Sequence, residues 1–546
     1  MRGAMITANR QKLRHFGDYQ TPILLVQEIL KFLAERGVSY VRVLEPTCGE
    51  GSFISALISE TEPPAEIQAV EIHEPYVEAV RALANSAKSE TRLVVRHANV
   101  FDLNLGSDID WKTAGPLLVI GNPPWVTNSE MGGLGESNMP RKTNFKNLPG
   151  FEAMTGASNF DIAESIVLKV IRELVSEAPT VALLCKTVVA RNVLEFAAKA
   201  RLPVSGATIR RVDAKRHFGA AVDACLFTFD VRQPVSYHAD VYESIGASVA
   251  QSRMGVLNGI LVSNLQAYEG GKRVDGISPL SWRQGLKHDA ASVMEGTLVG
   301  DGLFESKSGE RVELESEYIF PLLKSSDLFR ELCARPSRAV IVPQTRLGTN
   351  TEDLGSRAPH LGRYLERHRA TFDARRSSIY RNRSPFAIFG IGDYSFASYK
   401  VAISGFHADA RFRVVGPVNG RPVMFDDTCY FAPCDSAMHA ALIAALLEDR
   451  ECLQLLSALV DSRAKRPITV KILRRINVLA VLDHADRDSL LARASVHLDC
   501  LVPKGLIREW PDDLSDIMRV NTTDQRQRSL WDAHDPHMDA ENEVPS

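Results

Sequence analysis

The sequence predicts an α/β protein in which a first domain, built on a mostly parallel sheet with helices on both faces, precedes a second domain of mixed α+β character. In the first domain, short apolar runs alternate with runs of helical periodicity, as in doubly wound sheets. After residue 235 the apolar runs become shorter, and Gly and Arg become more frequent. The chain of 546 residues is also too long for one compact core.

These shifts in composition divide the chain into four parts. We expect a polar, flexible lead-in (1–17), an α/β domain (18–235), a second domain (236–510) and a C-terminal tail (511–546). The second domain has a basic centre (361–425) and a helical part (436–500). The tail holds nine acidic and three basic residues without an apolar pattern, which predicts disorder.

The composition indicates an ordinary globular protein, with 45% hydrophobic and 24% charged residues. We expect a cytoplasmic protein with no membrane partner, because no apolar stretch approaches the roughly 18 to 20 residues of a membrane span and the N-terminus lacks a signal-peptide core. The eight cysteines form no CxxC pair, and we expect Cys429 and Cys434 to be a strand and a turn residue rather than half of a zinc site. A net charge of -3 argues against a surface that binds polyanions all over.

The first elements form a helix, a strand, a turn and a second helix. The run ILLVQEILKFLAERG, after Thr21-Pro22, has helical periodicity and ends at Gly37. Next, VRVLEPTCGEGSFISALISE predicts a strand over 41–44, a Gly-containing turn over 46–51 and a helix from Ser52. A strand that leads into such a turn and helix begins a mononucleotide-binding unit, although the dinucleotide and P-loop signatures are absent.

Three more strands precede residue 126. The second, IQAVEIH, ends at Glu71, and the third, RLVVRHANVF, ends near Asn99. The fourth, 117–120, ends at Gly121-Asn122-Pro123-Pro124-Trp125. Ligands of open α/β sheets bind at the carboxyl ends of strands, and two prolines fix the backbone there. A rigid set of acceptors beside an aromatic plane suits a planar group with an amino function, such as a nucleobase, whereas the simpler interpretation is a Pro-rich turn.

The remaining elements follow a polar, Gly-rich interval over 126–158, which we expect to be functional or mobile. It contains RKTNFK, in which Lys142 is a candidate DNA contact. The pattern then predicts a helix over 160–174 and strands in VALLCKTVVA and ACLFTFDV. In the second domain the clearest helix is MHAALIAALLEDRECLQLLSALV.

Taken in order, DYQTP, LEPTCGEG, Glu71 and NPPW resemble the S-adenosylmethionine-dependent N6-adenine DNA methyltransferases of restriction-modification systems. The Thr-Pro segment precedes the cofactor motif and the target domain follows the catalytic one, which is the gamma order. The resemblance implies a Rossmann-like class I methyltransferase domain over the first part of the chain. It extends more loosely to about residue 480.

The resemblance implies that the cofactor is S-adenosylmethionine. Glu45 would accept from the amino group of its methionine part, and Glu71 would chelate the ribose hydroxyls, with a solvated helix cap as the alternative. The adenine amino group would meet Asn99 or Asp102, since the usual Asp is replaced by Asn99. The expected cofactor-binding residues are Thr21, Glu45, Pro46, Thr47, Gly49, Gly51, Glu71, Asn99, Asp102 and Asn122.

For catalysis, the Asn122 side-chain oxygen and the Pro123 carbonyl would accept both N6 hydrogens of an adenine that has left the duplex. Pro124 would hold the turn rigid, and Trp125 would stack on the base. Phe218 is the candidate for a second aromatic contact, with a role as core filler as its alternative. The segment Asn159-Phe160-Asp161 matches the part of the family that packs beside the cofactor adenine.

The second domain is predicted to bind double-stranded DNA. The segment RHRATFDARRSSIYRNR holds six arginines and one acid, and the basic centre holds eleven basic and four acidic residues. Arginines interleaved with polar side chains suit phosphate and groove contacts, whereas a solvated helix face is the alternative. The candidate contacts in this segment are Arg375, Arg376, Arg381 and Arg383.

Three other classes compete with this interpretation. Methyltransferases that act on guanine N2 of RNA or on protein glutamine share the NPP pocket, but they usually carry smaller appended domains. The second class is a restriction enzyme with a fused nuclease, but the sequence contains no clear PD-(D/E)xK nuclease motif. The third class is a non-catalytic DNA-binding relative, which would not need Asn122, Glu45 and Glu71. We therefore expect a modification enzyme that is a monomer or a dimer and that binds double-stranded DNA. A separately encoded restriction endonuclease is a further candidate partner.

Overall fold

The computed structural model describes residues 19–86, 90–126, 161–300, 302–333, 336–502, 510, 513 and 514. The chain separates into two compact units, and the division falls between Leu265 and Gln266. Among the described residues, no helix is both long and apolar enough to cross a membrane. The predicted lead-in over 1–17, Lys142, and nearly all of the predicted tail lie outside the described residues.

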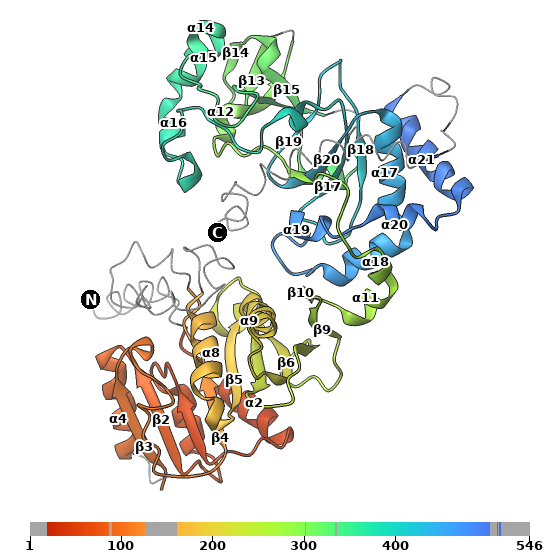
Figure 1. The fold of residues 1–546 in the computed structure, drawn as a ribbon. Helices are drawn as coiled ribbons and strands as arrows, with labels where there is room; N and C mark the ends of the chain where they lie inside the picture. The colour runs from red at the N-terminus through yellow and green to blue at the C-terminus, as the bar shows by residue number, and fades with distance from the viewer. Residues whose placement is uncertain are drawn as a thin grey trace. The chain divides into compact units, whose positions relative to one another are not determined.

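The first unit is built on a ten-stranded sheet whose order is β10-β9-β8-β6-β7-β5-β4-β1-β2-β3 (Figure 1). Strands β3, β2, β1, β4 and β5 pair in parallel, whereas β7 is antiparallel to β5 and β6. The strands are β1 Arg42–Glu45, β2 Glu66–Glu71, β3 Arg92–His97, β4 Leu117–Gly121, β5 Thr180–Lys186, β6 Ser205–Val212, β7 Ala224–Asp230, β8 His238–Tyr242, β9 Ser252–Leu257 and β10 Ile260–Val262. The mostly parallel α/β sheet predicted from the sequence is confirmed.

Helices cover both faces of this sheet because its central strands are apolar on both sides. In β4, Leu117 and Val119 pack with α8 and α9, whereas Leu118 and Ile120 pack with α2 and α3. The helices are α2 Ile23–Glu35, α3 Ser52–Ile58, α4 Glu74–Ser86, α8 Ile162–Glu173, α9 Thr187–Ala200 and α10 Ala214–Phe218. This layering leaves the strand ends as the place where polar groups can gather.

Two predictions for this unit need correction. The run VALLCKTVVA is not one strand, because β5 ends at Lys186 and Thr187 begins α9. The unit also extends past residue 235 to Leu265, because the short strands β8, β9 and β10 continue the same sheet through a parallel pairing of β8 with β6. The composition changes before the sheet ends.

The second unit combines two sheets with two groups of helices, as the predicted α+β character requires (Figure 1). A six-stranded sheet has the order β14-β13-β12-β16-β15-β19, and a four-stranded sheet has the order β11-β20-β17-β18. The strands are β11 Arg283–Gln284, β12 Glu295–Leu298, β13 Leu303–Ser306, β14 Arg311–Glu313, β15 Ile319–Leu323, β16 Arg338–Ile341, β17 Tyr399–Ser404, β18 Arg413–Val415, β19 Met424–Phe425 and β20 Cys429–Cys434. Both cysteines of the close pair lie in β20.

One group of helices shares a core with the six-stranded sheet, and most of the others follow the four-stranded sheet in the chain. The first group is α12 Ala291–Met294, α14 Leu354–Arg357, α15 Pro359–Arg367 and α16 Arg369–Asp373. The others are α11 Leu265–Gly271, α13 Ser325–Phe329, α17 Ala437–Leu447, α18 Arg450–Leu459, α19 Val470–Leu473, α20 Val478–Leu482 and α21 Arg487–Leu501. The long helix predicted after residue 436 is two helices, because Asp449 is extended and its side chain caps α18 at Glu451 N.

Candidate functional site

The carboxyl ends of β1 and β4 meet where the strand order of the first sheet reverses. Strands β1 and β4 are paired, with β2 and β3 on one side and β5 on the other. In open α/β sheets this position is the ligand crevice. A Cβ on Gly121, which has φ +153°, would lie 3.3 Å from Glu45 Cγ, so the ends of the two strands touch. The predicted cofactor motif and the NPPW motif therefore belong to one site.

The turn after β1 is tight and depends on glycine. Gly49 and Gly51 have φ of +52° and +82°, in the left-handed region that side chains disfavour. A Cβ on Gly51 would approach Val80 Cγ2 to 2.8 Å. The turn is held at its start by Cys48, whose N–H donates to the Val70 carbonyl at 3.0 Å. The backbone of this turn is thus fixed close to the ends of β1 and β2.

Glu45 is a buried carboxyl group with an unused acceptor. Its side chain is 2% exposed, and Oε2 has no hydrogen-bond partner among the described residues. Burial, together with the nearby charge of Glu71, raises the pKa of Glu45 well above its usual range. Thr47 Oγ1 is likewise buried and has no partner within the part of the chain that the structure describes. These two atoms fit a cationic, hydrogen-bonding group such as the amino group of S-adenosylmethionine.

Glu71 ends β2 and binds the same turn. Its Oε2 accepts from Gly49 N at 2.9 Å, and its Oε1 accepts from Ile72 N at 2.9 Å and His73 N at 2.8 Å. These contacts precede α4 as those of a helix cap would, but Glu71 is 6% exposed and thus not the solvated cap of the alternative. An ionised carboxylate offers about four lone-pair sites, so Oε2, with one donor, can still accept from a ribose hydroxyl.

At the end of β3, Asn99 is a cap. Its Oδ1 accepts from Phe101 N at 3.0 Å, at the start of a short 3₁₀ turn, Val100–Asp102. Asp102, in the same turn, is exposed. An amide oxygen has two lone pairs, so Asn99 Oδ1 can accept a second hydrogen bond, and both Asn99 and Asp102 stay candidates for the contact with the cofactor adenine.

Asn122 is held in one orientation by a main-chain contact. Its Nδ2 donates to the Tyr19 carbonyl at 2.8 Å, whereas its buried Oδ1 has no hydrogen-bond partner among the described residues. A flipped amide would bring two oxygens together. Pro123, which is buried, and Pro124 follow directly and fix the backbone. The structure therefore presents one oriented acceptor beside Glu45.

Three aromatic rings lie next to this acceptor. Trp125 contacts Phe218 edge to face with centroids 5.0 Å apart, and Tyr19 lies 5.5 Å from Trp125 and 6.0 Å from Phe218. The two expected stacking residues are thus neighbours, with exposures of 4% and 6%. Their edge-to-face contact leaves no room for a base between them, and Phe218 packs as the core-filler alternative describes. Stacking on a base by either ring stays a prediction.

The residues of the predicted adenine-side segment are only partly described. Asp161 caps α8 by accepting from Ala163 N at 3.0 Å, and its Oδ2 pairs with Lys186 Nζ at 3.1 Å. Ile162 N donates to the Val126 carbonyl at 3.0 Å, which joins this helix start to the NPPW segment. Asn159 and Phe160 lie outside the described residues.

The four arginines predicted to bind DNA do not behave alike. Arg375 is turned inward: its guanidinium donates to the carbonyls of Phe372, Ala387 and Pro385 at 3.0, 2.8 and 2.7 Å, and it stacks on Tyr380 at 3.7 Å. Such a guanidinium is committed to main-chain acceptors, so the assignment of Arg375 as a DNA contact is corrected to a structural role. The other three predicted contacts, Arg376, Arg381 and Arg383, are exposed.

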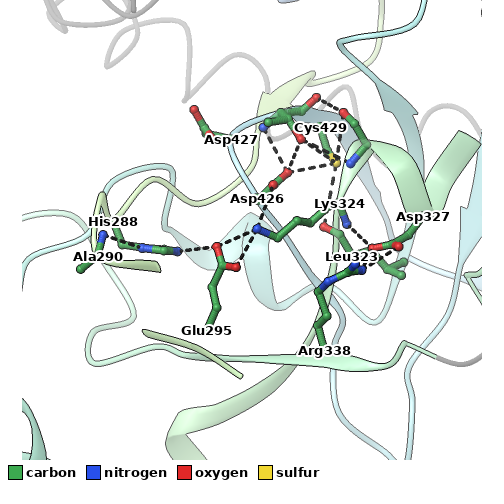
Figure 2. A network of polar contacts seen from close by, with 12 residues as sticks. His288, Ala290, Glu295, Leu323, Lys324, Asp327, Arg338, Asp426, Asp427 and Cys429 are labelled. Atoms are coloured by element: carbon green, nitrogen blue, oxygen red, sulfur yellow. Dashed lines mark hydrogen bonds and ion pairs between the residues drawn. The ribbon is translucent and has the colours of Figure 1, made fainter. Parts of the chain in front are cut away.

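A buried polar network lies in the second unit (Figure 2). Lys324 Nζ contacts Glu295 at 2.6 Å and Asp426 at 3.7 Å, and His288 Nε2 lies 3.4 Å from Glu295. Although burial opposes it, hydrogen bonds from His288 and Lys324 lower the pKa of Glu295 to about 2. The network connects β12 with the ends of β15 and β19, so we assign it a structural role in holding these strands together. The described residues contain no cluster that could hold a metal ion.

Sequence reasoning did not select Tyr19 and Gln20 as site residues. The Tyr19 carbonyl orients Asn122, and Gln20 Oε1 accepts from Glu50 N at 3.1 Å. A main-chain acceptor leaves no mark on residue type, which explains why Tyr19 was overlooked. The only signal was the position of both residues directly before Thr21-Pro22.

Comparison with known proteins identifies a relative over most of the chain and solved structures with a similar fold. The type II methyltransferase M.NspV from Nostoc sp. is 34% identical over 476 residues, which cover 85% of this chain and 96% of the relative. The type IIL restriction-modification enzyme MmeI, solved in complex with DNA, is similar in structure with a TM-score of 0.53 and 13% identity, over 92% of this chain and 75% of that one. No protein-family model matches the chain.

Proposed function

Because the chain belongs to the family of type II methyltransferases, we propose that it transfers a methyl group from S-adenosylmethionine to N6 of an adenine in double-stranded DNA. The single observation that supports this reaction best is the oriented, unpartnered Oδ1 of Asn122 next to the Glu45 crevice. In this proposal the protein is the modification enzyme of a bacterial restriction-modification or phage-defence system. A separately encoded endonuclease is then its natural counterpart.

The cofactor pocket of the proposal is formed by residues at three neighbouring strand ends. Glu45 provides an ionisable acceptor for the amino group, and Glu71 provides an acceptor for a ribose hydroxyl. The glycine turn allows the backbone to approach the ligand closely. When bound, S-adenosylmethionine supplies an activated methyl group on a sulfonium.

The catalytic part of the proposal rests on Asn122 and Pro123. Adenine N6 is a poor nucleophile because its lone pair is delocalised into the ring. Accepting its two hydrogens with Asn122 Oδ1 and the Pro123 carbonyl would favour a tetrahedral nitrogen whose lone pair is free to react. These acceptors act by positioning and preorganisation, which contribute about 7 to 11 kcal/mol in favourable cases. No strong base is needed, because the methylated nitrogen is acidic.

The target adenine must leave the double helix to reach such an acceptor. Trp125 is the proposed stacking surface, since it follows Asn122 after two rigid prolines. Because Phe218 covers part of Trp125 in the structure, we propose that the base displaces one edge of this aromatic cluster. Phe218 sits at the end of the short helix α10, directly before Gly219 with φ +69°, where a small backbone change moves the ring.

The second unit would hold the DNA, and the exposed arginines at 376, 381 and 383 are the proposed phosphate contacts. Asn382, between two of them, has φ +59°, a conformation that makes the chain turn sharply. The Arg375 clamp holds the start of this segment to its surroundings. Because the turn is already ordered, its arginines can contact phosphates without the loss of entropy that ordering a flexible loop on DNA binding would cause.

The proposal is tested by incubating the protein with plasmid DNA and labelled S-adenosylmethionine, and then mapping modified bases by sequencing. We expect N6-methyladenine at one short recurring sequence. In parallel reactions with total RNA or cell protein as substrate, label in either one, but not in DNA, would instead support the competing guanine or glutamine methyltransferases. The Asn122→Ala variant serves as the matched negative control.

A further inference from the structure

The three residues 19–21 connect the two halves of the site. Gln20 Oε1 accepts from Glu50 N at 3.1 Å, in the turn between Gly49 and Gly51. The carbonyl of the preceding residue, Tyr19, accepts from Asn122 Nδ2 at 2.8 Å. One contact reaches the proposed cofactor turn, and the other reaches the proposed catalytic amide. The two acceptors belong to adjacent residues.

The fit between Gln20 and the turn is close. A Cβ placed on Gly49 would lie 2.9 Å from Gln20 Oε1 and 3.0 Å from its Nε2. The Gln20 carboxamide therefore packs directly against the glycine and hydrogen-bonds the next N–H. The N–H of Gly49 itself donates to Glu71 Oε2 at 2.9 Å. Glu71 and Gln20 thus hold two successive peptide groups of the turn, and a ligand that binds Glu71 acts on the peptide next to the one that contacts Gln20.

The segment is anchored on its other side. Thr21 is 7% exposed, and Pro22 precedes α2 with φ -61°, accepting from Leu25 N at 3.0 Å. The inward face of α2 packs in the core that also contains Trp125 and Phe218. With Thr21 fixed, only two planar peptide groups separate this anchor from the Tyr19 carbonyl, so few backbone dihedrals can absorb a displacement of Gln20.

We infer that Gln20 is a positioning residue that couples the cofactor turn to the orientation of the Asn122 amide. The inference rests on the proposed function, because it concerns the same site. Gln20 touches the turn through its side chain and acts on Asn122 through the Tyr19 carbonyl. Loss of the Gln20 acceptor loosens the carbonyl that keeps Asn122 Oδ1 directed at its target. A misplaced catalytic group can cost roughly 100-fold in rate, and a loosened one costs less.

The test uses the full-length protein and two substitutions of Gln20. Gln20→Met keeps the length of the side chain but removes the acceptor, whereas Gln20→Glu keeps an acceptor. Gln27→Met, on the exposed face of α2, is the matched control. Thermal unfolding, calorimetric affinity for S-adenosylhomocysteine, and single-turnover methylation at saturating S-adenosylmethionine and plasmid DNA are measured for each variant.

For Gln20→Met we expect a single-turnover rate about tenfold lower at saturating cofactor, with an unfolding temperature like that of the Gln27→Met control. Gln20→Glu should restore most of the rate. A weaker affinity with an unchanged saturating rate would overturn the coupling, because Gln20 would then serve the cofactor alone. Unchanged affinity and rate would overturn it as well.

A second readout does not depend on activity. Amide hydrogen exchange is followed in the peptide that contains Asn122, with and without S-adenosylhomocysteine. The coupling predicts that the ligand slows this exchange in the wild type and in Gln27→Met, but not in Gln20→Met. Equal slowing in all three proteins, or none in the wild type, would refute the coupling. If the wild type binds the ligand and shows the slowing but methylates no adenine, the proposed function fails and the coupling survives.

Discussion

Glu45 and Glu71 place two carboxyl groups beside one glycine turn, so that the charge of Glu71 adds to burial in opposing the ionisation of Glu45. The raised pKa means that Glu45 keeps its proton to a higher pH than an ordinary carboxyl group does. A ligand with an ammonium group favours the ionised form and must expel that proton. Cofactor binding and proton release are therefore linked at this site.

This linkage predicts that cofactor affinity rises with pH. Below the raised pKa of Glu45, the affinity for S-adenosylhomocysteine should increase by up to about tenfold per pH unit. Calorimetry in buffers with different ionisation heats will report the released proton. Glu45→Gln should flatten the pH profile and weaken binding by about 10- to 100-fold, since a charge-assisted hydrogen bond is worth about 1.5 to 3 kcal/mol. A slope equal to that of the wild type in Glu45→Gln would contradict the assignment.

Glu45 also makes the stability of the ligand-free protein depend on pH, but stability falls as pH rises, whereas cofactor affinity increases. Because the folded-state pKa of Glu45 lies above its usual value, the free energy of unfolding falls as pH rises from about 4.5 toward the raised value. The Glu45→Gln variant does not lose stability in this way, because glutamine does not ionise. Urea unfolding of the ligand-free proteins should therefore show Glu45→Gln gaining on the wild type as pH increases.

Asn122→Ala should reduce the methylation rate by roughly 100- to 1,000-fold, the typical effect of removing one preorganised polar contact to a transition state. Its affinity for S-adenosylhomocysteine should stay within about threefold of the wild type, because the proposed contacts to the amino group and the ribose of the cofactor lie on Glu45 and Glu71. Single-turnover kinetics and calorimetry measure the two effects. Retained methylation would disprove the catalytic role of Asn122.

Arg375→Ala should destabilise the second unit, because the guanidinium donates to several main-chain carbonyls that are left unpaired. We expect a loss on the order of 2 kcal/mol in the free energy of unfolding. The exposed neighbour Arg376 is the matched control, and its replacement by Ala should change stability by less than about 0.5 kcal/mol. Chemical denaturation distinguishes the two variants.

Replacing Arg376, Arg381 and Arg383 by Ala should lower DNA affinity and its dependence on salt. Each phosphate contact removed should reduce the slope of log K against log salt concentration by about 1. Arg450→Ala, an exposed arginine of α18, provides the control. If the slope is the same in the triple variant and the control, the DNA surface lies elsewhere on the protein.

Lys324→Met should leave Glu295 with only His288 as a partner and cost on the order of 3 kcal/mol at neutral pH. The depressed pKa of Glu295 contributes stability above about pH 4.5, and this contribution is lost as pH falls toward 2. The gap between wild type and Lys324→Met should therefore shrink below pH 4.5. Lys307→Met, at an exposed site, should show no such gap in urea titrations.

Elements with a strong local signal were predictable. The run that became β1, its glycine turn and α3 were read from apolar periodicity and glycine spacing, and the same pattern placed Glu45 and Asn122 at strand ends. The break between β5 and α9 was not predictable, because the β-branched residues after Lys186 favour a strand locally. Burial of Val189 and Ala190 against the sheet decides for the helix.

Contacts made by main-chain groups, or by charged side chains that point into the protein, could not be predicted from the sequence. The six arginines of the basic segment have the same appearance in sequence, and only the fold shows that Arg375 is clamped by carbonyls. The Tyr19 carbonyl contact requires a fold that brings residues 19 and 122 together. Long-range main-chain contacts of this kind have no signature in residue type.

The adjacency of Glu45 and Gly121 has a consequence for how this chain tolerates change in length. The two residues are neighbours through strand pairing, so the chain between them does not set their separation. Extra residues inserted in the exposed connection between α3 and β2, for example after Thr61, should leave the catalytic geometry intact. Deleting a single residue inside β1 would turn the Glu45 side chain to the other face of the sheet and abolish the site.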